Sequence, residues 1–123
     1  MGKFAIKTTK SGVKFDLKAN NGEIIASSEV YKTLVSCKNG IESVRKNSAK
    51  AEVEDLTVEN APKVKHPKFQ VYNDKAGEFR FRLRATNGQI IAVSEGYKSK
   101  ASCLNGIESI KKNAPEAEVV TVE

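Results

Sequence analysis

The chain has 123 residues, of which 39% are hydrophobic and 29% are charged, so its composition is that of a folded globular protein and excludes a disordered or fibrous one. Its net charge of +6 is spread along the chain without a basic tail or block, which predicts a mild preference for anions and nothing stronger. No apolar run is long enough for a signal peptide or a membrane span, and two cysteines fit a reducing compartment, so we expect a cytoplasmic protein with no membrane partner.

Two copies of one unit make up nearly the whole chain. KFAIKTTKSG (3–12) aligns with KFQVYNDKAG (68–77), and FDLKANNGEIIASSEVYK (15–32) aligns with FRLRATNGQIIAVSEGYK (81–98). The dodecamers SCKNGIESVRKN (36–47) and SCLNGIESIKKN (102–113) follow. Between the copies, VENAPKVKHP has two prolines and no apolar period, which indicates a linker. We therefore divide the chain into a first repeat (1–57), a linker (58–67) and a second repeat (68–123).

Each repeat is predicted to begin with three strands. In FRFRLR (79–84) apolar residues alternate strictly with arginines, so Phe79, Phe81 and Leu83 share one face of a strand and the arginines the other. The segments NNG (20–22) and TNG (86–88) predict hairpin turns of the Asn-Gly type before the third strand.

The period then changes to that of a helix, for which Thr33 and Ser99 are the predicted N-caps. One helical face carries the apolar or small residues Cys37, Ile41, Val44 and Ser48 in the first copy and Cys103, Ile107, Ile110 and Ala114 in the second. A glycine inside a helix costs about 1 kcal/mol relative to alanine, so Gly40 and Gly106 predict a close contact between helix and sheet. A final strand, within 51–58 or 117–123, is expected to close each unit.

The predicted fold class is α+β, with two tandem β(3)-α-β repeats. A unit of about 55 residues buries too little surface to be stable alone. We therefore expect the two repeats to share one core as a pseudo-two-fold unit, and we expect the protein to be a monomer by internal duplication. The expected architecture is a mostly antiparallel, curved sheet with two helices on one side. The sequence leaves open whether the repeats pack side by side or exchange strands.

The segment GEFRFRLRATNGQIIAVSEGYKSKASCLNGIESIKKNAPEAEV (77–119) resembles the YegP-like family of small bacterial and archaeal proteins. The resemblance rests on the NG-I-ES-V/I-KKN helix and on the SE-x-Y-K segment before it, and it covers nearly the whole chain apart from the linker. It implies β(3)-α-β repeats that assemble into one curved sheet. It implies no activity and transfers no catalytic residue.

No catalytic set, metal site or cofactor is predicted. The single histidine, His66, lies in the linker, so neither a Cys-His nucleophile nor a metal cluster can be assembled. Cys37 and Cys103 are predicted to be buried thiols on the apolar faces of their helices. A redox pair is the alternative interpretation, but it would need Cα atoms within about 7 Å, which the sequence does not establish.

Two sets of polar or basic residues are candidate sites. The repeated helix carries a possible paired polar site on its flank, made of Asn39, Glu42, Ser43, Asn105, Glu108 and Ser109. Its structural alternative is an asparagine amide bonded to a neighbouring turn. The open side of the predicted sheet carries a possible anion or nucleic-acid face, made of Lys14, Lys18, Arg80, Arg82 and Arg84. Asp16 interrupts this face, and the strand phenylalanines alternate onto the opposite side.

The leading hypothesis is a small non-enzymatic binding or interaction module whose partner is a protein or an anionic ligand that meets the sheet. The alternative is weak binding of single-stranded nucleic acid through the basic strand face. An enzyme remains as a remote third possibility, because the sequence shows no phosphate loop, nucleophile elbow or acid–base pair.

Overall fold

A computed structural model of the protein describes residues 2–122. The first repeat forms β1 (Lys3–Thr8), β2 (Val13–Lys18), β3 (Ile24–Ser27), α1 (Leu34–Ser48) and β4 (Glu52–Asp55). The second repeat forms β5 (Lys68–Asn73), β6 (Phe79–Arg84), β7 (Ile90–Ser94), α2 (Lys100–Asn113), the short 3-10 helix η1 (Ala114–Glu116) and β8 (Glu118–Val122). The predicted β(3)-α-β order is therefore confirmed in both repeats.

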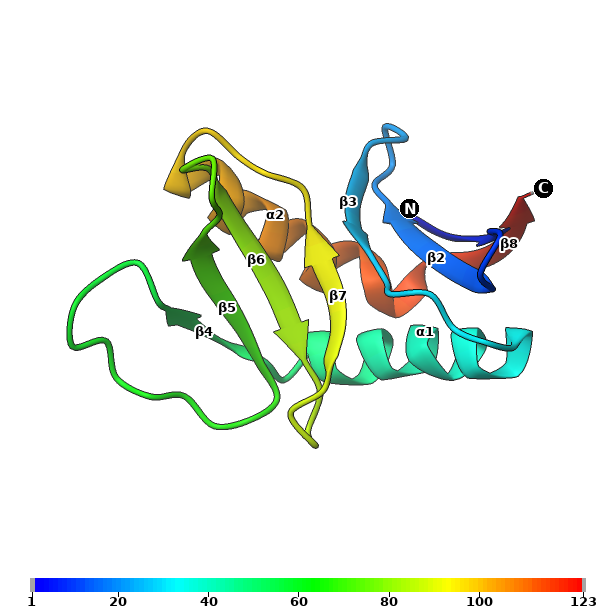
Figure 1. The fold of residues 1–123 in the computed structure, drawn as a ribbon, viewed down its shortest axis with the longest axis horizontal. Helices are drawn as coiled ribbons and strands as arrows, with labels where there is room; N and C mark the ends of the chain where they lie inside the picture. Colours follow the sequence, from blue (N-terminus) through cyan, green and yellow to red (C-terminus); the bar gives the residue numbers. More distant parts are fainter. Residues whose placement is uncertain (1, 123) are drawn as a thin grey trace.

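All eight of these strands belong to one sheet, in the order β4-β5-β6-β7-β3-β2-β1-β8. Its neighbouring strands are antiparallel except for the two outermost pairs, β4 with β5 and β8 with β1, which are parallel. Both helices lie behind this sheet in Figure 1. The α+β class, the mostly antiparallel sheet and the helices on one side are as predicted.

The last strand of each repeat does not close its own unit as expected, and of the two arrangements that the sequence leaves open the structure has strand exchange. β4 of the first repeat pairs with β5 of the second, and β8 of the second repeat pairs with β1 of the first. The reason is the length of the helix: the 15 residues of α1 extend over about 22 Å. Figure 1 shows α1 running from beneath β2 to the half of the sheet that holds β5 and β6. The two repeats therefore exchange their last strands.

The two halves of the sheet meet at a short seam between β3 and β7. Only two residue pairs, Ala26 with Ser94 and Ser27 with Val93, form the ladder there. Each helix packs on strands from both repeats, α1 against β2, β6 and β7 and α2 against β3 and β6. The seam is thus held by the helices beneath it as well as by its own hydrogen bonds.

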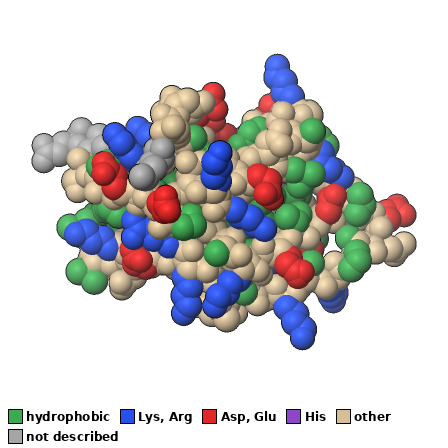
Figure 2. All heavy atoms as spheres, turned by 180° about the vertical axis from the view of Figure 1, so that it is seen from behind, with side chains coloured by type: hydrophobic (Ala, Val, Ile, Leu, Met, Phe, Trp, Pro, Cys, Tyr) green, Lys and Arg blue, Asp and Glu red, His purple; other side chains and the backbone are tan. Residues whose placement is uncertain are grey.

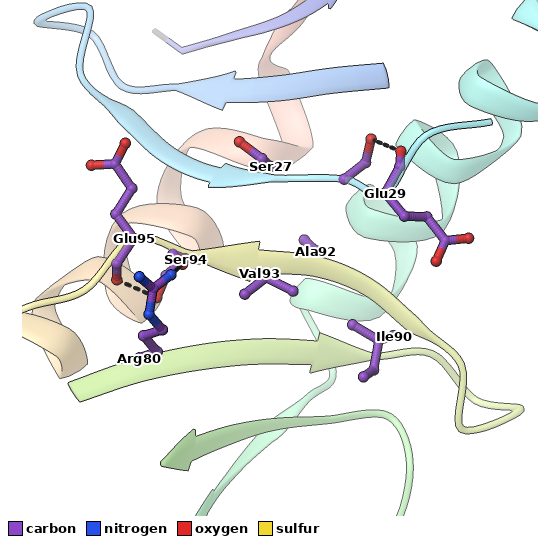
Figure 3. Close-up of a pocket in the computed structure, with 9 residues that line it drawn as sticks. Ser27, Glu29, Arg80, Ile90, Ala92, Val93, Ser94 and Glu95 are labelled. Carbon is purple, nitrogen blue, oxygen red and sulfur yellow. Dashed lines mark hydrogen bonds between the residues drawn. The ribbon is translucent and has the colours of Figure 1, made fainter. Parts of the chain in front are cut away.

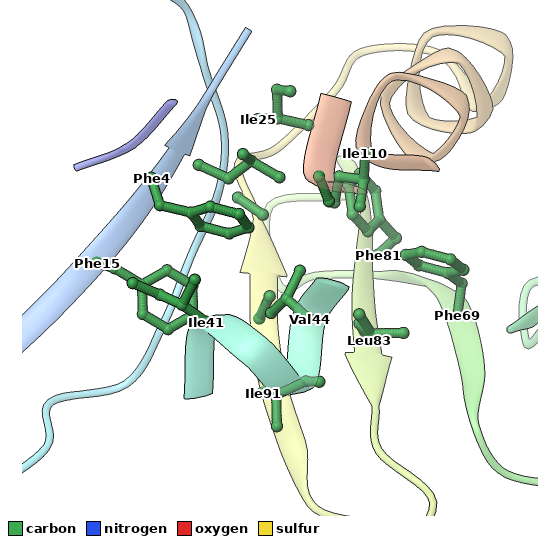
Figure 4. Packing of buried hydrophobic residues seen from close by; sticks show 14 of the residues in the cluster. Phe4, Phe15, Ile25, Ile41, Val44, Phe69, Phe81, Leu83, Ile91 and Ile110 are labelled. Carbon is green, nitrogen blue, oxygen red and sulfur yellow. The ribbon is translucent and has the colours of Figure 1, made fainter. Parts of the chain in front are cut away.

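One hydrophobic core extends across the seam. Figure 4 shows Val44 of α1 between the aromatic residues of the two repeats. In the first repeat Phe4 meets Phe15 edge to face with 5.7 Å between ring centroids, and in the second Phe69 meets Phe81 in the same way at 6.0 Å. Because these four phenylalanines and Val44 belong to one cluster of buried residues, neither repeat has a separate core of its own.

The helix starts and mid-helix glycines follow the sequence prediction. The hydroxyls of Thr33 and Ser99 each accept the backbone N–H three residues later at 3.1 Å, as N-caps do. A methyl group at Gly40 would lie 2.7 Å from Cζ of Tyr31 and closer still to its hydroxyl, so the close approach predicted for this glycine is confirmed. The ring of Tyr31 also stacks on Phe15.

The Asn-Gly hairpins are three-residue loops and not the two-residue turns that this dipeptide usually forms. In the first hairpin the N–H of Gly22 donates to the carbonyl of Ala19 at 2.9 Å, and that of Ala19 donates to the carbonyl of Glu23 at 2.8 Å. Gly22 has a φ of 87°, whereas Asn21 is not among the described residues with positive φ. A type I′ turn requires positive φ at both positions, so the glycine alone supplies the left-handed residue.

Candidate functional site

Two equivalent crevices lie where the helix of one repeat faces the Asn-Gly hairpin of the other. The first crevice lies between α1 and the β6–β7 hairpin, and the second between α2 and the β2–β3 hairpin. The first is lined by Tyr31, Ser36, Asn39, Gly40, Glu42, Ser43, Lys46, Asn47, Ala85, Thr86, Asn87, Gln89 and Ile91. The second is lined by Ala19, Asn20, Asn21, Asn105, Glu108, Ser109, Lys112, Asn113 and Glu116.

All six residues predicted for the paired polar site line these crevices, three in each, so one half of the pair lies on each helix. Asn39, Glu42 and Ser43 lie in the first crevice. Asn105, Glu108 and Ser109 lie in the second. The sequence interpretation missed the opposite walls, which come from the hairpins of the other repeat. The repeated Asn-Gly at 21–22 and 87–88 was the available signal, but only the strand exchange places each hairpin opposite the other repeat's helix.

The amide that bonds to a neighbouring turn is Asn47 and not Asn39. Nδ2 of Asn47 donates to the carbonyl and the hydroxyl of Ser43 at 2.8 and 3.0 Å, and its Oδ1 accepts a hydrogen bond of 3.1 Å from Thr86. Asn113 repeats the two bonds to its own helix, with Ser109. Asn39 is exposed and has no hydrogen-bond partner among residues 2–122.

The crevice side of the helix is identical in the two repeats, while the outer side differs. Ser, Asn, Glu, Ser, Lys and Asn recur unchanged at positions 36/102, 39/105, 42/108, 43/109, 46/112 and 47/113. The outer side, on which every one of these residues except Lys100 is exposed, changes from Leu34, Val35 and Lys38 to Lys100, Ala101 and Leu104. Folding constrains an exposed side chain weakly. The recurrence of Asn39 as Asn105 is therefore not explained by the fold.

Both crevices offer hydrogen-bond donors and acceptors together with charges of both signs. In the first, Glu42 is paired with Arg45 at 2.8 Å and Lys46 has no partner among the described residues. The second is an open hollow of about 600 Å³. Such a lining suits a polar partner whose own charges are balanced, and it does not form a strong anion site. Figure 2, which shows the side away from the viewer in Figure 1, has blue and red side chains interspersed.

The predicted basic residues lie on the open face of the sheet, the side turned away from the helices, but two of them, Lys14 and Arg80, are paired with acidic neighbours. Nε of Arg80 contacts Asp74 at 2.6 Å, and this hydrogen bond raises the pKa of Arg80 and lowers the pKa of Asp74. Asp16 binds Lys7 and Lys14. Burial alone would raise the pKa of Asp16, but a hydrogen bond from Ser27 and these lysines lower it overall.

The remaining arginines converge on a glutamine. Nε of Arg82 and Nε of Arg84 both donate to Oε1 of Gln70, at 2.8 and 2.6 Å. The guanidinium of Arg82 also lies 4.5 Å from the ring centroid of Tyr72, so this ring is covered. Lys18 has no partner within residues 2–122. On the predicted face Asp16 and Asp74 thus offset the charges of Lys14 and Arg80, whereas those of Arg82 and Arg84 have no acidic partner among the described residues.

A third hollow lies on the open face at the seam between β3 and β7, and Figure 3 shows its lining. Ser28 and Ser94 are equivalent in the two repeats, and the hydroxyl of each is hydrogen-bonded to the backbone. Each accepts the N–H of a core phenylalanine and donates to the carbonyl of the next residue. Ser27 and Val93, also equivalent, differ in type. The equivalent and exposed Glu29 and Glu95 are the duplicated polar groups of this hollow, which differs from the two crevices in having no duplicated amide in its lining.

Cys37 and Cys103 are free thiols with no exposed surface, as predicted. Burial raises the pKa of both, and that of Cys103 reaches about 11. Within residues 2–122 no group of three or more His, Cys, Asp or Glu side chains is arranged to hold a metal ion. No helix in this part of the chain is both long and apolar enough to cross a membrane.

Residues 10–55 and 74–120 each match the family described as domain of unknown function (DUF1508). A UPF0339 protein from Pseudomonas aeruginosa is 41% identical over 94% of this chain and 92% of its own length. Shorter matches reach 73% identity with a UPF0339 protein from Stutzerimonas stutzeri, over 39% of this chain and 43% of that one. Another, 64% identical, spans 45% of this chain and 95% of a Treponema denticola relative, which is about one repeat long.

A solved structure shares the fold. The solution NMR structure of the protein of unknown function YegP from Escherichia coli covers 98% of this chain with a TM-score of 0.79 and 32% sequence identity. The match extends over 91% of that chain, so the two proteins have the same two-repeat organisation. The resemblance inferred from the repeated helix is thereby confirmed.

Proposed function

Because the chain belongs to the DUF1508 family of UPF0339 proteins, whose function is unknown, we propose a function from its own surface: it is a non-enzymatic binding module with two equivalent polar crevices. The observation that carries the proposal is the difference between the two sides of the repeated helix. The crevice side keeps Asn39 and Lys46 as Asn105 and Lys112, although these side chains are exposed and have no partners that the fold requires.

The partner we propose is a protein that presents a polar, charge-balanced segment to each crevice. Amides and hydroxyls, such as those of Asn39 and Ser43, can donate and accept hydrogen bonds, which matches the backbone of a polypeptide. The chain carries two such sites, so we propose that it binds two copies of the partner, one in each crevice. We propose that the protein acts as a monomer, since its internal duplication already supplies both halves of each crevice.

The experiment that tests this function is affinity capture from lysate, with the intact protein, a crevice variant and a control variant each immobilised in turn. We expect the intact protein to retain a stoichiometric protein partner after nuclease treatment. The double variant Asn39→Arg/Asn105→Arg should lose it, because each arginine adds bulk and charge within a crevice. The control variant Lys38→Ala/Leu104→Ala changes exposed residues on the outer side of the same helices and should retain the partner. Equal retention by all three proteins, or an empty capture by the intact protein, contradicts the proposal.

Weak binding of single-stranded nucleic acid is the second candidate function, and the specific observation that favours it is the uncompensated charge of Arg82 and Arg84. Three features weaken it. Arg80 is paired with Asp74, Asp16 offsets part of the positive charge of the equivalent strand in the first repeat, and the ring of Tyr72 is covered by Arg82. Single-strand binders normally combine a basic groove with exposed stacking rings.

A further inference from the structure

We infer that Arg82 and Arg84 form an oxyanion-binding site on the open face of β6, specific for a phosphoryl group and separate from the two crevices. The two guanidinium groups lie side by side because both donate to the same oxygen of Gln70. Arg84 is further fixed by a bond of 2.8 Å from Nη1 to the carbonyl of Gly88. Two cations held together in this way repel each other unless an anion lies between or above them.

No carboxylate of the described residues forms an ion pair with either arginine. The nearest acid in the network, Glu54, is bonded on the far side of Gln70, where Nε2 of the glutamine donates to it at 2.7 Å. Glu54 is already paired with Lys68 at 3.0 Å and also accepts the N–H of Val64 at 2.9 Å. Together Glu54, Lys68, Arg82 and Arg84 carry a net charge of +2.

Unused donors remain at this place. Within residues 2–122 nothing accepts a hydrogen bond from either terminal nitrogen of Arg82 or from Nη2 of Arg84. Both side chains are half-buried, and the ring of Tyr72 lies against one side of Arg82. Fixed, partly desolvated guanidinium groups with free donors match the oxygen atoms of phosphate better than flexible lysines do.

The fold does not require this arrangement, because the equivalent position of the first repeat has the same backbone structure without an arginine pair. There the equivalents of Arg82 and Arg84 are Asp16 and Lys18, and Ala5 stands in place of Gln70. Asp16 stands between Lys7 and Lys14 and pairs with both, so an acid occupies the position of Arg82 and no two guanidinium groups are held together. The arginine pair is therefore a feature of the second repeat alone, in contrast to the duplicated crevices.

The test follows the arginine side chains directly by NMR while inorganic phosphate is added to the full-length protein. We expect saturable shifts of the Nε–Hε signals of Arg82 and Arg84. Removing one charged donor, in Arg82→Gln, should weaken phosphate binding about tenfold. Arg80→Gln is the matched control, because Arg80 lies on the same strand but is neutralised by Asp74, and it should leave the affinity unchanged. Amide spectra of each variant confirm that it is folded.

A second titration with a single-stranded oligonucleotide distinguishes a free phosphate group from a phosphodiester backbone as the source of the oxyanion. Binding of either ligand that is weakened by Arg82→Gln and not by Arg80→Gln supports the site. Shifts that sodium chloride reproduces at equal ionic strength would overturn it, because they would report general screening. Equal weakening by Arg80→Gln, or no saturable shift with either ligand, would overturn it as well.

Discussion

The hydroxyl of Thr86, in the hairpin of the second repeat, donates a hydrogen bond of 3.1 Å to Oδ1 of Asn47, near the end of the helix of the first repeat. The same amide donates to Ser43 on its own helix, so it fixes the two walls of the first crevice relative to each other. Each crevice thus requires both repeats. The repeats also depend on each other because β4 of the first pairs with β5 of the second and β8 of the second pairs with β1 of the first.

Cutting the chain in the linker, between Asn60 and Ala61, should give two fragments that fold only together. Each fragment lacks the strand that completes its half of the sheet and exposes the core face that its helix shares with the other half. Circular dichroism should show little cooperative unfolding for either fragment as a monomer. The mixture should form a 1:1 complex with the spectrum of the intact protein and a melting temperature that rises with concentration. A fragment that is monomeric and melts cooperatively alone contradicts this expectation.

Replacing Gly40 by alanine should destabilise the protein, although alanine is the better helix former by about 1 kcal/mol. The new methyl group would meet the ring of Tyr31, and we expect a loss of about 1 to 3 kcal/mol in the free energy of unfolding measured with urea. In the background of Tyr31→Leu the two closest contacts are absent and only Cε2 of Phe15 lies near the added methyl group, at 3.2 Å, so the cost of Gly40→Ala should there become much smaller. The same cost in both backgrounds would show that the tyrosine is not the cause.

Glu54 should make the stability of the protein depend on pH in the acidic range. A hydrogen bond from Gln70, followed by one from the N–H of Val64, lowers its pKa from the ordinary value of 4.5 to about 2. A carboxylate whose pKa is lower in the folded state stabilises that state above its unfolded pKa and loses this contribution as the pH falls towards the folded pKa. The window is therefore between about pH 4.5 and pH 2.

The variant Glu54→Gln isolates this contribution from those of other carboxylates. At pH 6 we expect it to be less stable than the intact protein by about 2 kcal/mol, since Lys68 loses its partner. The difference in unfolding free energy between the two proteins should shrink steadily as the pH is lowered from 4.5 to 2. A difference that does not change with pH would refute the assignment.

The two thiols should react slowly in the native protein. Only the thiolate is nucleophilic, and burial removes access to Cys37 and Cys103 as well as raising the pKa of each. With a disulfide reagent at pH 8 we expect labelling at least about a hundredfold slower than in denaturant, limited by opening of the structure. Val35→Cys provides an exposed control, since Val35 is 69% exposed, and it should label at once. Rapid native labelling of all the thiols would contradict the buried assignment.

Most of the fold could be predicted from the sequence, because the information was local. The alternation in FRFRLR and the helical spacing of Cys37, Ile41 and Val44 each depend on neighbours within one element. The pairing of β4, by contrast, depends on residues far away in the sequence. The sequence AEVEDLTV would pair as well with β1 as with β5, and only the span of α1 across the seam decides between them. The 3-10 helix at Ala114–Glu116 was likewise not anticipated.

The candidate site was predictable on one wall only. The repeated dodecamer identified Asn39, Glu42 and Ser43, because helical spacing places them on one flank. The opposite wall at Thr86 and Asn87 follows from the exchange, which the repeat pattern does not encode. The arginine face was predicted as a charged strand, but the pairing of Arg80 with Asp74 depends on side-chain geometry at a turn.

The most direct test of the central claim is the amount of partner retained per chain at saturation. Because the protein has two equivalent crevices, the variant Asn39→Arg should retain half as much partner as the intact protein, and Asn105→Arg should also retain half. The double variant should retain none, while Lys38→Ala/Leu104→Ala should retain the full amount. A double variant that binds as much partner as the intact protein would contradict the assignment of the crevices as the binding sites.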